Sequence, residues 1–64
     1  MDDKYARKTA KYMNLAVTGT MGVLIKAKQK GLIDKVKPVM DRLIQNGLYV
    51  SSEVQLSVLK IAGE

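Results

Sequence analysis

Residues 14–24 have the sequence N-L-A-V-T-G-T-M-G-V-L, and the interpretation of this stretch decides the expected fold. Its first part, Leu15-Ala16-Val17-Thr18, is short, largely apolar and bounded by Asn14 and Gly19. Because four residues are too few for a helix between these two breakers, the pattern predicts one buried strand at residues 15–18. A helix over residues 21–30 is expected to follow after a tight turn.

Helical patterns surround this strand. Residues 4–13 contain no Gly or Pro, and their apolar side chains recur at helical spacing. A third helix is expected from an Asp34 cap to about Asn46, with Pro38 in or near its first turn. A fourth is expected to begin after Ser51 or Ser52. The predicted fold is therefore mainly α, with about four helices and one short β-strand in the order α-β-α-α-α, in a single domain over residues 1–64.

Two glycines are expected to close helices. Gly31 ends the helix over residues 21–30, and Leu32 can then fold back on Ala27 in a Schellman motif. Gly47 is expected to end the next helix in the same way, with Leu48 folding back on Leu43. Gly22 is expected to make room where a helix start approaches the preceding strand.

The amino-acid composition excludes some kinds of cross-link and metal site. The 64 residues include no Cys and no His, which excludes disulfides and zinc sites built on thiolate or imidazole. No apolar run reaches the roughly 18 residues that span a membrane, and Met1-Asp2-Asp3 does not begin a signal peptide. The chain is therefore expected in the cytoplasm. Its net charge of +5 suits RNA or DNA as a partner, although the charge by itself is better explained by a solvated basic surface.

Four basic residues share one face of the first predicted helix. Lys4, Arg7, Lys8 and Lys11 are spaced by three and four positions and form a candidate phosphate-binding face, or else a solvated helix face. The acids just before them can cap the helix or bind a metal.

The lone strand at residues 15–18 implies a partner. Its backbone N–H and C=O groups need a second strand, and no other segment of the chain offers one of comparable quality. A chain this short also buries only about 60% of its surface on folding. Both observations predict a homo-oligomer that forms through this strand.

One string of residues resembles a known family. V-T-G-T-M-G-V-L at residues 17–24 is followed by A-K at 27–28 and G-L-I at 31–33, and D-D at 2–3 by A-R at 6–7. This pattern resembles the C-terminal half of PIN-domain proteins of the VapC-like toxin ribonuclease superfamily, in a subgroup labelled predicted nucleic-acid-binding proteins. The resemblance covers essentially the whole sequence.

The resemblance implies an α/β parent domain in which acidic side chains hold Mg²⁺ or Mn²⁺ for RNA cleavage. Asp2 and Asp3 match one acidic position of that site, and the other acids of this sequence match none. The resemblance therefore implies a truncated PIN-like module with no catalytic residues and no cofactor of its own. It would associate with nucleic acid in a toxin–antitoxin type of system, with an antitoxin as partner.

A second function class remains open. A strand followed by two helices is also the element order of a ribbon-helix-helix protein, a small dimeric regulator whose paired strands enter the DNA major groove. Against it, the strand at residues 15–18 carries only Thr18 as a polar group and no Arg or Lys to contact bases.

Overall fold

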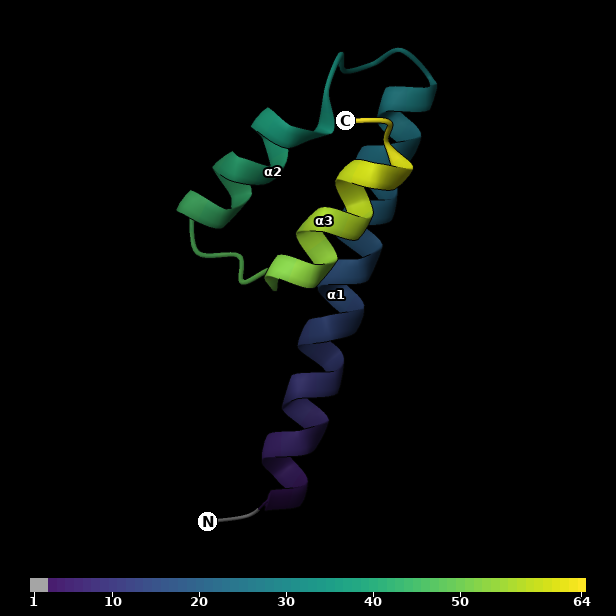
Figure 1. Cartoon of the computed structure of the whole chain (residues 1–64). Helices are drawn as coiled ribbons and strands as arrows, with labels where there is room; N and C mark the ends of the chain where they lie inside the picture. The colour runs from purple at the N-terminus through teal and green to yellow at the C-terminus, as the bar shows by residue number, and fades with distance from the viewer. Residues whose placement is uncertain (1–2) are drawn as a thin grey trace.

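The computed structural model describes residues 3–64. Over this range the chain forms three helices and no strand: α1 (Asp3–Gln29), α2 (Val36–Gln45) and α3 (Ser52–Ile61). Figure 1 shows α2 and α3 beside the C-terminal half of the much longer α1. The prediction of a mainly helical fold is confirmed. The predicted strand and the count of four helices are wrong, because residues 15–18 lie in the middle of α1.

A helix satisfies the backbone of this segment where an isolated strand could not. In α1 each interior N–H group bonds a carbonyl of the same helix, so that no second strand is needed. The threonine hydroxyls also bond the preceding turn: Thr18 Oγ1 donates to the carbonyl of Asn14 at 2.8 Å, and Thr20 Oγ1 to that of Ala16 at 2.9 Å. The expected strand–turn–helix unit is one continuous helix, and strand pairing at residues 15–18 is therefore no route to an oligomer.

The glycines inside α1 have no packing role in this structure. A Cβ added at Gly19 or Gly22 would meet no atom within 4 Å. The expected close approach of a strand at Gly22 is therefore wrong. Both positions tolerate a side chain, and their cost to the helix is the usual conformational entropy of glycine.

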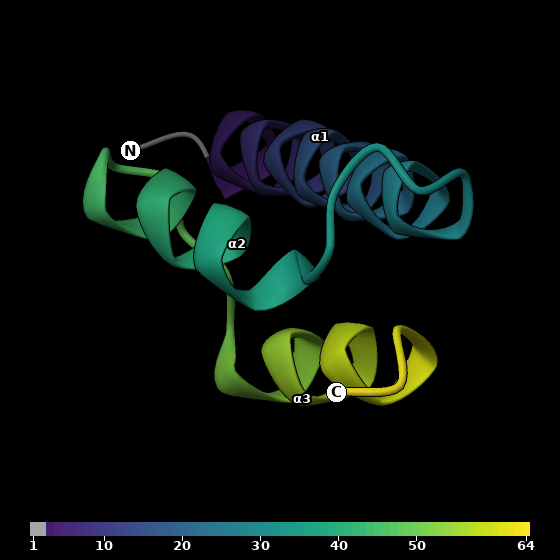
Figure 2. The same cartoon turned by 90° about the horizontal axis from the view of Figure 1, so that it is seen from above.

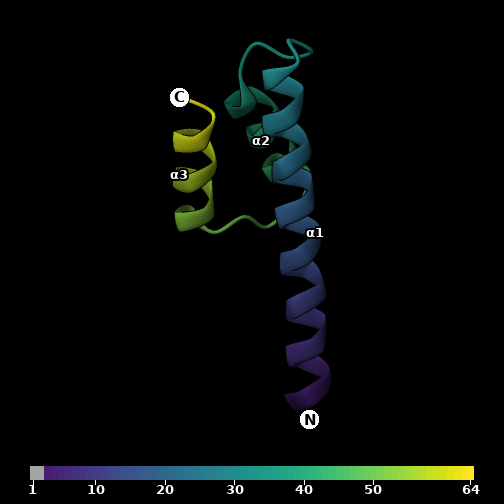
Figure 3. The same cartoon turned by 90° about the vertical axis from the view of Figure 1, so that its right-hand side faces the viewer.

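α1 is divided into a packed half and a protruding half. Its 27 residues make a rod about 40 Å long at 1.5 Å per residue, and the molecule measures 45 × 19 × 18 Å. Figures 1 and 3 show α2 and α3 on the same side of its C-terminal half, while the N-terminal half extends beyond them. Residues 3–16 are all exposed. We call residues 3–16 the protruding half.

The core lies between the packed half of α1 and the two shorter helices (Figure 2). Val17, Met21, Leu24 and Ile25 recur at intervals of four, three and one, which puts them on one face of α1. Of these Met21 is buried. The buried residues that meet this face come from α2, from the segment before α3, and from α3: Val36, Met40, Val50 and Val58.

The helix ends are well defined by short-range hydrogen bonds. At the end of α1, Gly31 has a φ of 74° and the N–H of Leu32 donates to the carbonyl of Ala27 at 2.9 Å. This confirms the predicted Schellman motif. Gly47 closes α2 in the same way, with a φ of 108°. Ser51, one of the two predicted candidates, is the N-cap of α3, and its Oγ accepts from the N–H of Val54 at 3.3 Å.

No helix formed by residues 3–64 combines the length and the hydropathy needed to cross a membrane.

Replacing Gly19 or Gly22 with Ala should stabilise the protein. Each change removes a helix-interior glycine without a clash, which is worth about 0.8–1.0 kcal/mol. For a domain of this size, that raises the midpoint of thermal unfolding by roughly 4–8 °C. Circular dichroism at 222 nm during a temperature scan measures this shift.

The matched control is Gly31→Ala. Because Gly31 has a φ of 74°, an alanine there adopts a left-handed conformation that costs about 1–2 kcal/mol. The control should lower the midpoint. If Gly19→Ala destabilised the chain as much as Gly31→Ala, residues 15–19 would not be part of a continuous helix.

Candidate nucleic-acid interface

The four predicted basic residues lie together on the protruding half of α1. Lys4, Arg7, Lys8 and Lys11 line one open hollow of about 270 Å³. They meet there because positions i, i+3, i+4 and i+7 of a helix share one face. All four residues are exposed. We call these four residues the basic face.

Three residues of the basic face, Arg7, Lys8 and Lys11, make no ion pair within the described part of the chain. Asp3 stands in the first turn of α1, where a negative charge suits the positive end of the helix dipole. The lysine and arginine side chains present donors only, and these suit phosphate oxygens. Phosphate groups of a polynucleotide are therefore chemically suitable ligands for this surface.

Two tyrosines lie on the same protruding half. Tyr5 is 72% exposed and Tyr12 is 68% exposed. The spacing of these residues next to alanines predicts half-buried packing, and that interpretation is wrong because neither α2 nor α3 reaches this part of α1. Exposed aromatic rings beside basic residues can stack on unpaired bases. The sequence feature that points to this aromatic surface is the seven-residue interval between the two tyrosines, because residues seven apart lie on one side of a helix.

The acidic residues are dispersed. Asp2 and Asp3 are the two residues that the resemblance assigns to a metal site. Asp2 lies outside the described residues, and Asp3 is the first residue of α1. Asp41 pairs with Lys37 on α2, with 3.0 Å between Oδ2 and Nζ. Glu53 stands in the first turn of α3. Between residues 3 and 64, no three acidic side chains come close enough to hold a metal ion together.

Glu64 connects three helix ends. Its Oε2 accepts a hydrogen bond from the N–H of Val36 at 2.7 Å, and its Oε1 accepts one from the N–H of Lys37 at 3.1 Å. Lys28 Nζ on α1 lies 3.1 Å from Oε2 and also donates to the carbonyl of Ala62, at the end of α3. We call this arrangement of Lys28, Glu64 and the first turn of α2 the carboxylate clamp.

The N-terminal cap of α2 differs from the predicted one. The sequence predicts Asp34 as the cap of this helix, but the N-cap is Lys35, whose side chain carries only donors and cannot accept from the backbone. The first N–H groups of a helix have no partner within it. The carboxylate of Glu64, 28 positions after Val36, accepts from two of them instead. Lys28 of α1 is part of the same arrangement.

The environment of Glu64 changes its acidity. Burial by itself would raise the pKa of the carboxyl. The hydrogen bonds from the backbone N–H groups of Val36 and Lys37, together with the hydrogen bond and charge of Lys28, outweigh this effect and lower the pKa. The ionised carboxylate is therefore the form that the folded structure stabilises.

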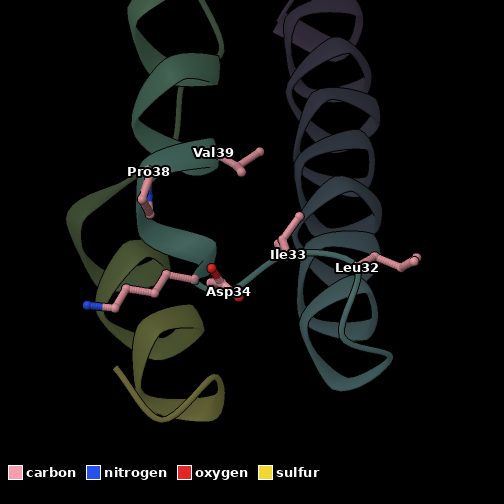
Figure 4. A pocket seen from close by; sticks show the side chains of 6 residues that line it. Leu32, Ile33, Asp34, Pro38 and Val39 are labelled. Atoms are coloured by element: carbon pink, nitrogen blue, oxygen red, sulfur yellow. The ribbon is translucent and has the colours of Figure 1, made fainter.

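A second open hollow lies where α1 connects to α2. Figure 4 shows Ile33 and Val39 pointing into the gap between these helices, while Leu32 points away from it. Asp34 and Pro38 lie on the rim of the hollow, whose volume is about 520 Å³. Besides the aliphatic side chains, the hollow is lined by the carboxylate of Asp34 and the ammonium group of Lys35. One carboxylate is too few to hold a divalent metal ion.

Comparison with known proteins identifies a family. A family model described as a PIN domain matches residues 1–64. No curated protein matches the chain significantly, and no solved structure does.

The carboxylate clamp should make stability depend on pH. Because the folded-state pKa of Glu64 is lowered, its contribution is complete above the ordinary value of 4.5. As the pH falls from there through the lowered pKa, protonation of Glu64 should remove this contribution. Glu64→Gln should therefore unfold at a lower temperature than the unmodified chain at pH 7, with the difference disappearing in acid.

The measurement is thermal unfolding between pH 2 and pH 7. Glu53→Gln is the control, because Glu53 is exposed in the first turn of α3 and lies outside the clamp. An equal effect of both substitutions across the whole pH range would show that Glu64 contributes no more than an ordinary surface carboxylate.

Proposed function

The chain belongs to the PIN-domain family, and we propose that it functions as a nucleic-acid-associated module without metal-dependent cleavage activity of its own. The observation that carries this proposal is the basic face. Lys4, Arg7, Lys8 and Lys11 surround one hollow on a part of α1 that no other helix covers.

The position of the basic face supports binding to a long polyanion. On the protruding half of α1, a polynucleotide can approach without contact with α2 or α3 (Figure 3). Residues 4 to 11 extend over about 10 Å of helix, a length over which a polynucleotide strand presents more than one phosphate. Contacts of this kind are independent of sequence, so that the expected binding is non-specific.

The exposed tyrosines favour single-stranded over double-stranded nucleic acid. Tyr5 and Tyr12 lie about 11 Å apart along the axis of α1, next to the basic face. An aromatic ring can stack on the face of any unpaired base, whereas the bases of a duplex are already stacked on one another. Single-stranded nucleic acid, RNA or DNA, is therefore the ligand class that we propose, and single-stranded RNA is the probe used in the test.

The dispersed acids support the second part of the proposal. Cleavage of a phosphodiester with Mg²⁺ or Mn²⁺ requires several carboxylates that converge on the ion. Asp41 is paired with Lys37, and Glu64 is held in the carboxylate clamp. The resemblance to toxin-like PIN proteins is the basis for proposing a role in a toxin–antitoxin type of system.

Binding should weaken as salt is added. If the basic face contacts four phosphates, the logarithm of the affinity for single-stranded RNA should fall with the logarithm of salt with a slope of about −3. Replacing all four basic residues with Gln should abolish most of the binding. Fluorescence anisotropy of a labelled oligonucleotide between 50 and 200 mM salt, roughly the range in which this effect is large, measures both effects.

The matched control removes the same number of charges elsewhere. It is the quadruple Gln variant of four exposed lysines outside the protruding half: Lys26, Lys30, Lys35 and Lys60. This control should retain most of the affinity. Equal losses in the two variants would indicate that net charge, and not the basic face, determines binding.

The chain should not cleave RNA in the presence of Mg²⁺ or Mn²⁺. Incubation with an end-labelled RNA, followed by denaturing gel electrophoresis, tests this expectation. The control is a variant with Asp2→Ala and Asp3→Ala, which removes both carboxylates that match the family's metal site. Cleavage by the unmodified chain and not by this variant would contradict the proposal.

A further inference from the structure

A small hollow lies on the outer side of α1 near its C-terminal end. Its volume is about 190 Å³, and it is lined by three aliphatic residues and two lysines: Val23, Ala27, Leu32, Lys26 and Lys30. Val23 and Leu32 are not among the residues that pack against the core. Leu32 points away from the gap between α1 and α2 (Figure 4). The hollow is therefore open to an external ligand.

The way in which α1 ends creates this hollow. In the Schellman motif, the N–H of Leu32 donates to the carbonyl of Ala27 at 2.9 Å. The apolar residue after such a turn ordinarily contacts an apolar side chain in the last turn of the helix. Because alanine offers only a methyl group, Leu32 remains 74% exposed, and Val23, one turn before Ala27, is 67% exposed. Space for one more apolar side chain is left between them.

Two lysines form one edge of the hollow. Lys26 and Lys30 are four positions apart, so they follow each other along α1 with an axial rise of about 6 Å. Val23 and Ala27 form the row next to them. Neither lysine makes an ion pair within the part of the chain that the structure describes, and residues 4–33 contain no Asp or Glu. This edge therefore attracts negative charge.

An apolar hollow with a cationic edge suits an acidic peptide. The hollow is smaller than the roughly 300–1,000 Å³ of sites that hold drug-sized molecules, and it suits one branched aliphatic side chain. A nucleic-acid base would find no aromatic ring to stack on there, because the apolar side chains of the hollow are all aliphatic. An amphipathic helix can present a leucine and, on the adjoining row, two carboxylates with the same spacing of four as the lysines.

This chain does not contain such an acidic segment itself. No two of its six acids are three or four positions apart: Asp2, Asp3, Asp34, Asp41, Glu53 and Glu64. A second copy of the chain therefore lacks the charge pattern that matches the two lysines, and the ligand is a different protein.

We propose that the hollow between Val23 and Leu32 binds an acidic amphipathic helix of a partner protein. A large aliphatic side chain of the partner enters the hollow, and two carboxylates pair with Lys26 and Lys30. Exposed ion pairs contribute little to affinity, so the apolar contact provides most of the binding and the lysines select an acidic partner. This inference is independent of the nucleic-acid proposal, because the basic face and the hollow share no residue.

An NMR titration of the isotope-labelled chain tests the site. The probe is a synthetic alanine-based helical peptide with one central leucine and two glutamates four positions apart on the adjoining row. The backbone amide signals of residues 23–32 are expected to shift as the peptide binds, and those of residues 4–11 are expected to stay unchanged. A peptide with Ser in place of the leucine should bind at least about ten-fold more weakly.

Two variants of the chain separate the apolar contact from the charge. Ala27→Leu fills the hollow and keeps both lysines, so it should weaken peptide binding at least about ten-fold. It should not lower the midpoint of thermal unfolding, because leucine is a good helix former and gives Leu32 an apolar contact. Lys26→Gln combined with Lys30→Gln should weaken binding about five-fold. The matched control, Lys35→Gln with Lys60→Gln, removes two exposed lysines outside the hollow and should retain the affinity.

Three results overturn the proposal. The first is the absence of shifts at residues 23–32 with millimolar peptide, roughly the weakest binding of interest. The second is an equal loss of binding in the two lysine variants. The third is displacement of the peptide from these amides by single-stranded RNA, which would make the hollow part of the nucleic-acid surface. Because Lys26→Gln with Lys30→Gln leaves the basic face intact, RNA binding by this variant shows whether the nucleic-acid proposal holds when the peptide proposal fails.

Discussion

The carboxylate of Glu64 joins the C-terminal end of α1, the N-terminal end of α2 and the C-terminal end of α3. It accepts from two backbone N–H groups of α2 and pairs with Lys28 of α1, which in turn donates to the end of α3. α2 and α3 have only ten residues each, a length at which a helix needs tertiary contacts to form. The small core of five buried residues provides part of this support, and the clamp fixes the relative position of the helix ends around it.

α1 packs against α2 and α3 only along its C-terminal half, and its N-terminal half is exposed to solvent. In the packed half, one face meets α2 and α3, and the opposite faces are solvated. In the protruding half the same periodicity continues without a covering element, so that apolar, aromatic and basic side chains are all presented to solvent. A nucleic acid could therefore approach this half without contact with α2 or α3.

The resemblance to PIN-domain proteins and the structure differ on whether this chain contains a strand. The resemblance to PIN-domain proteins implies a sheet, whereas residues 15–18 lie within α1 and residues 3–64 contain no strand. A strand is stable only when its backbone groups pair with a neighbour, and a helix satisfies these groups internally. Valine and threonine have high strand propensity, but propensity is weaker than the requirement for hydrogen-bond partners.

The ends of the helices could be predicted from the sequence, because they depend on residues close to one another in the chain. Gly31 and Gly47 end helices with left-handed turns, and Ser51 caps α3, because each needs only residues within one or two helical turns. The basic face was also predictable, since a spacing of three and four residues puts side chains on one side of any helix, even though residues 4–11 were assigned to a shorter helix than α1.

The features that depend on residues far apart in the chain were determined only by the tertiary structure. No local pattern shows that Glu64 caps α2, because its partners are 27 and 28 positions away and Asp34 is the nearer acceptor in sequence. Nor does the sequence show that Tyr5 and Tyr12 are exposed, since their burial depends on whether α2 and α3 reach the N-terminal half of α1. The sequence by itself determined where helices can end and which side chains share a face. Only packing decided which faces are covered, because burial is a property of two surfaces and not of one segment.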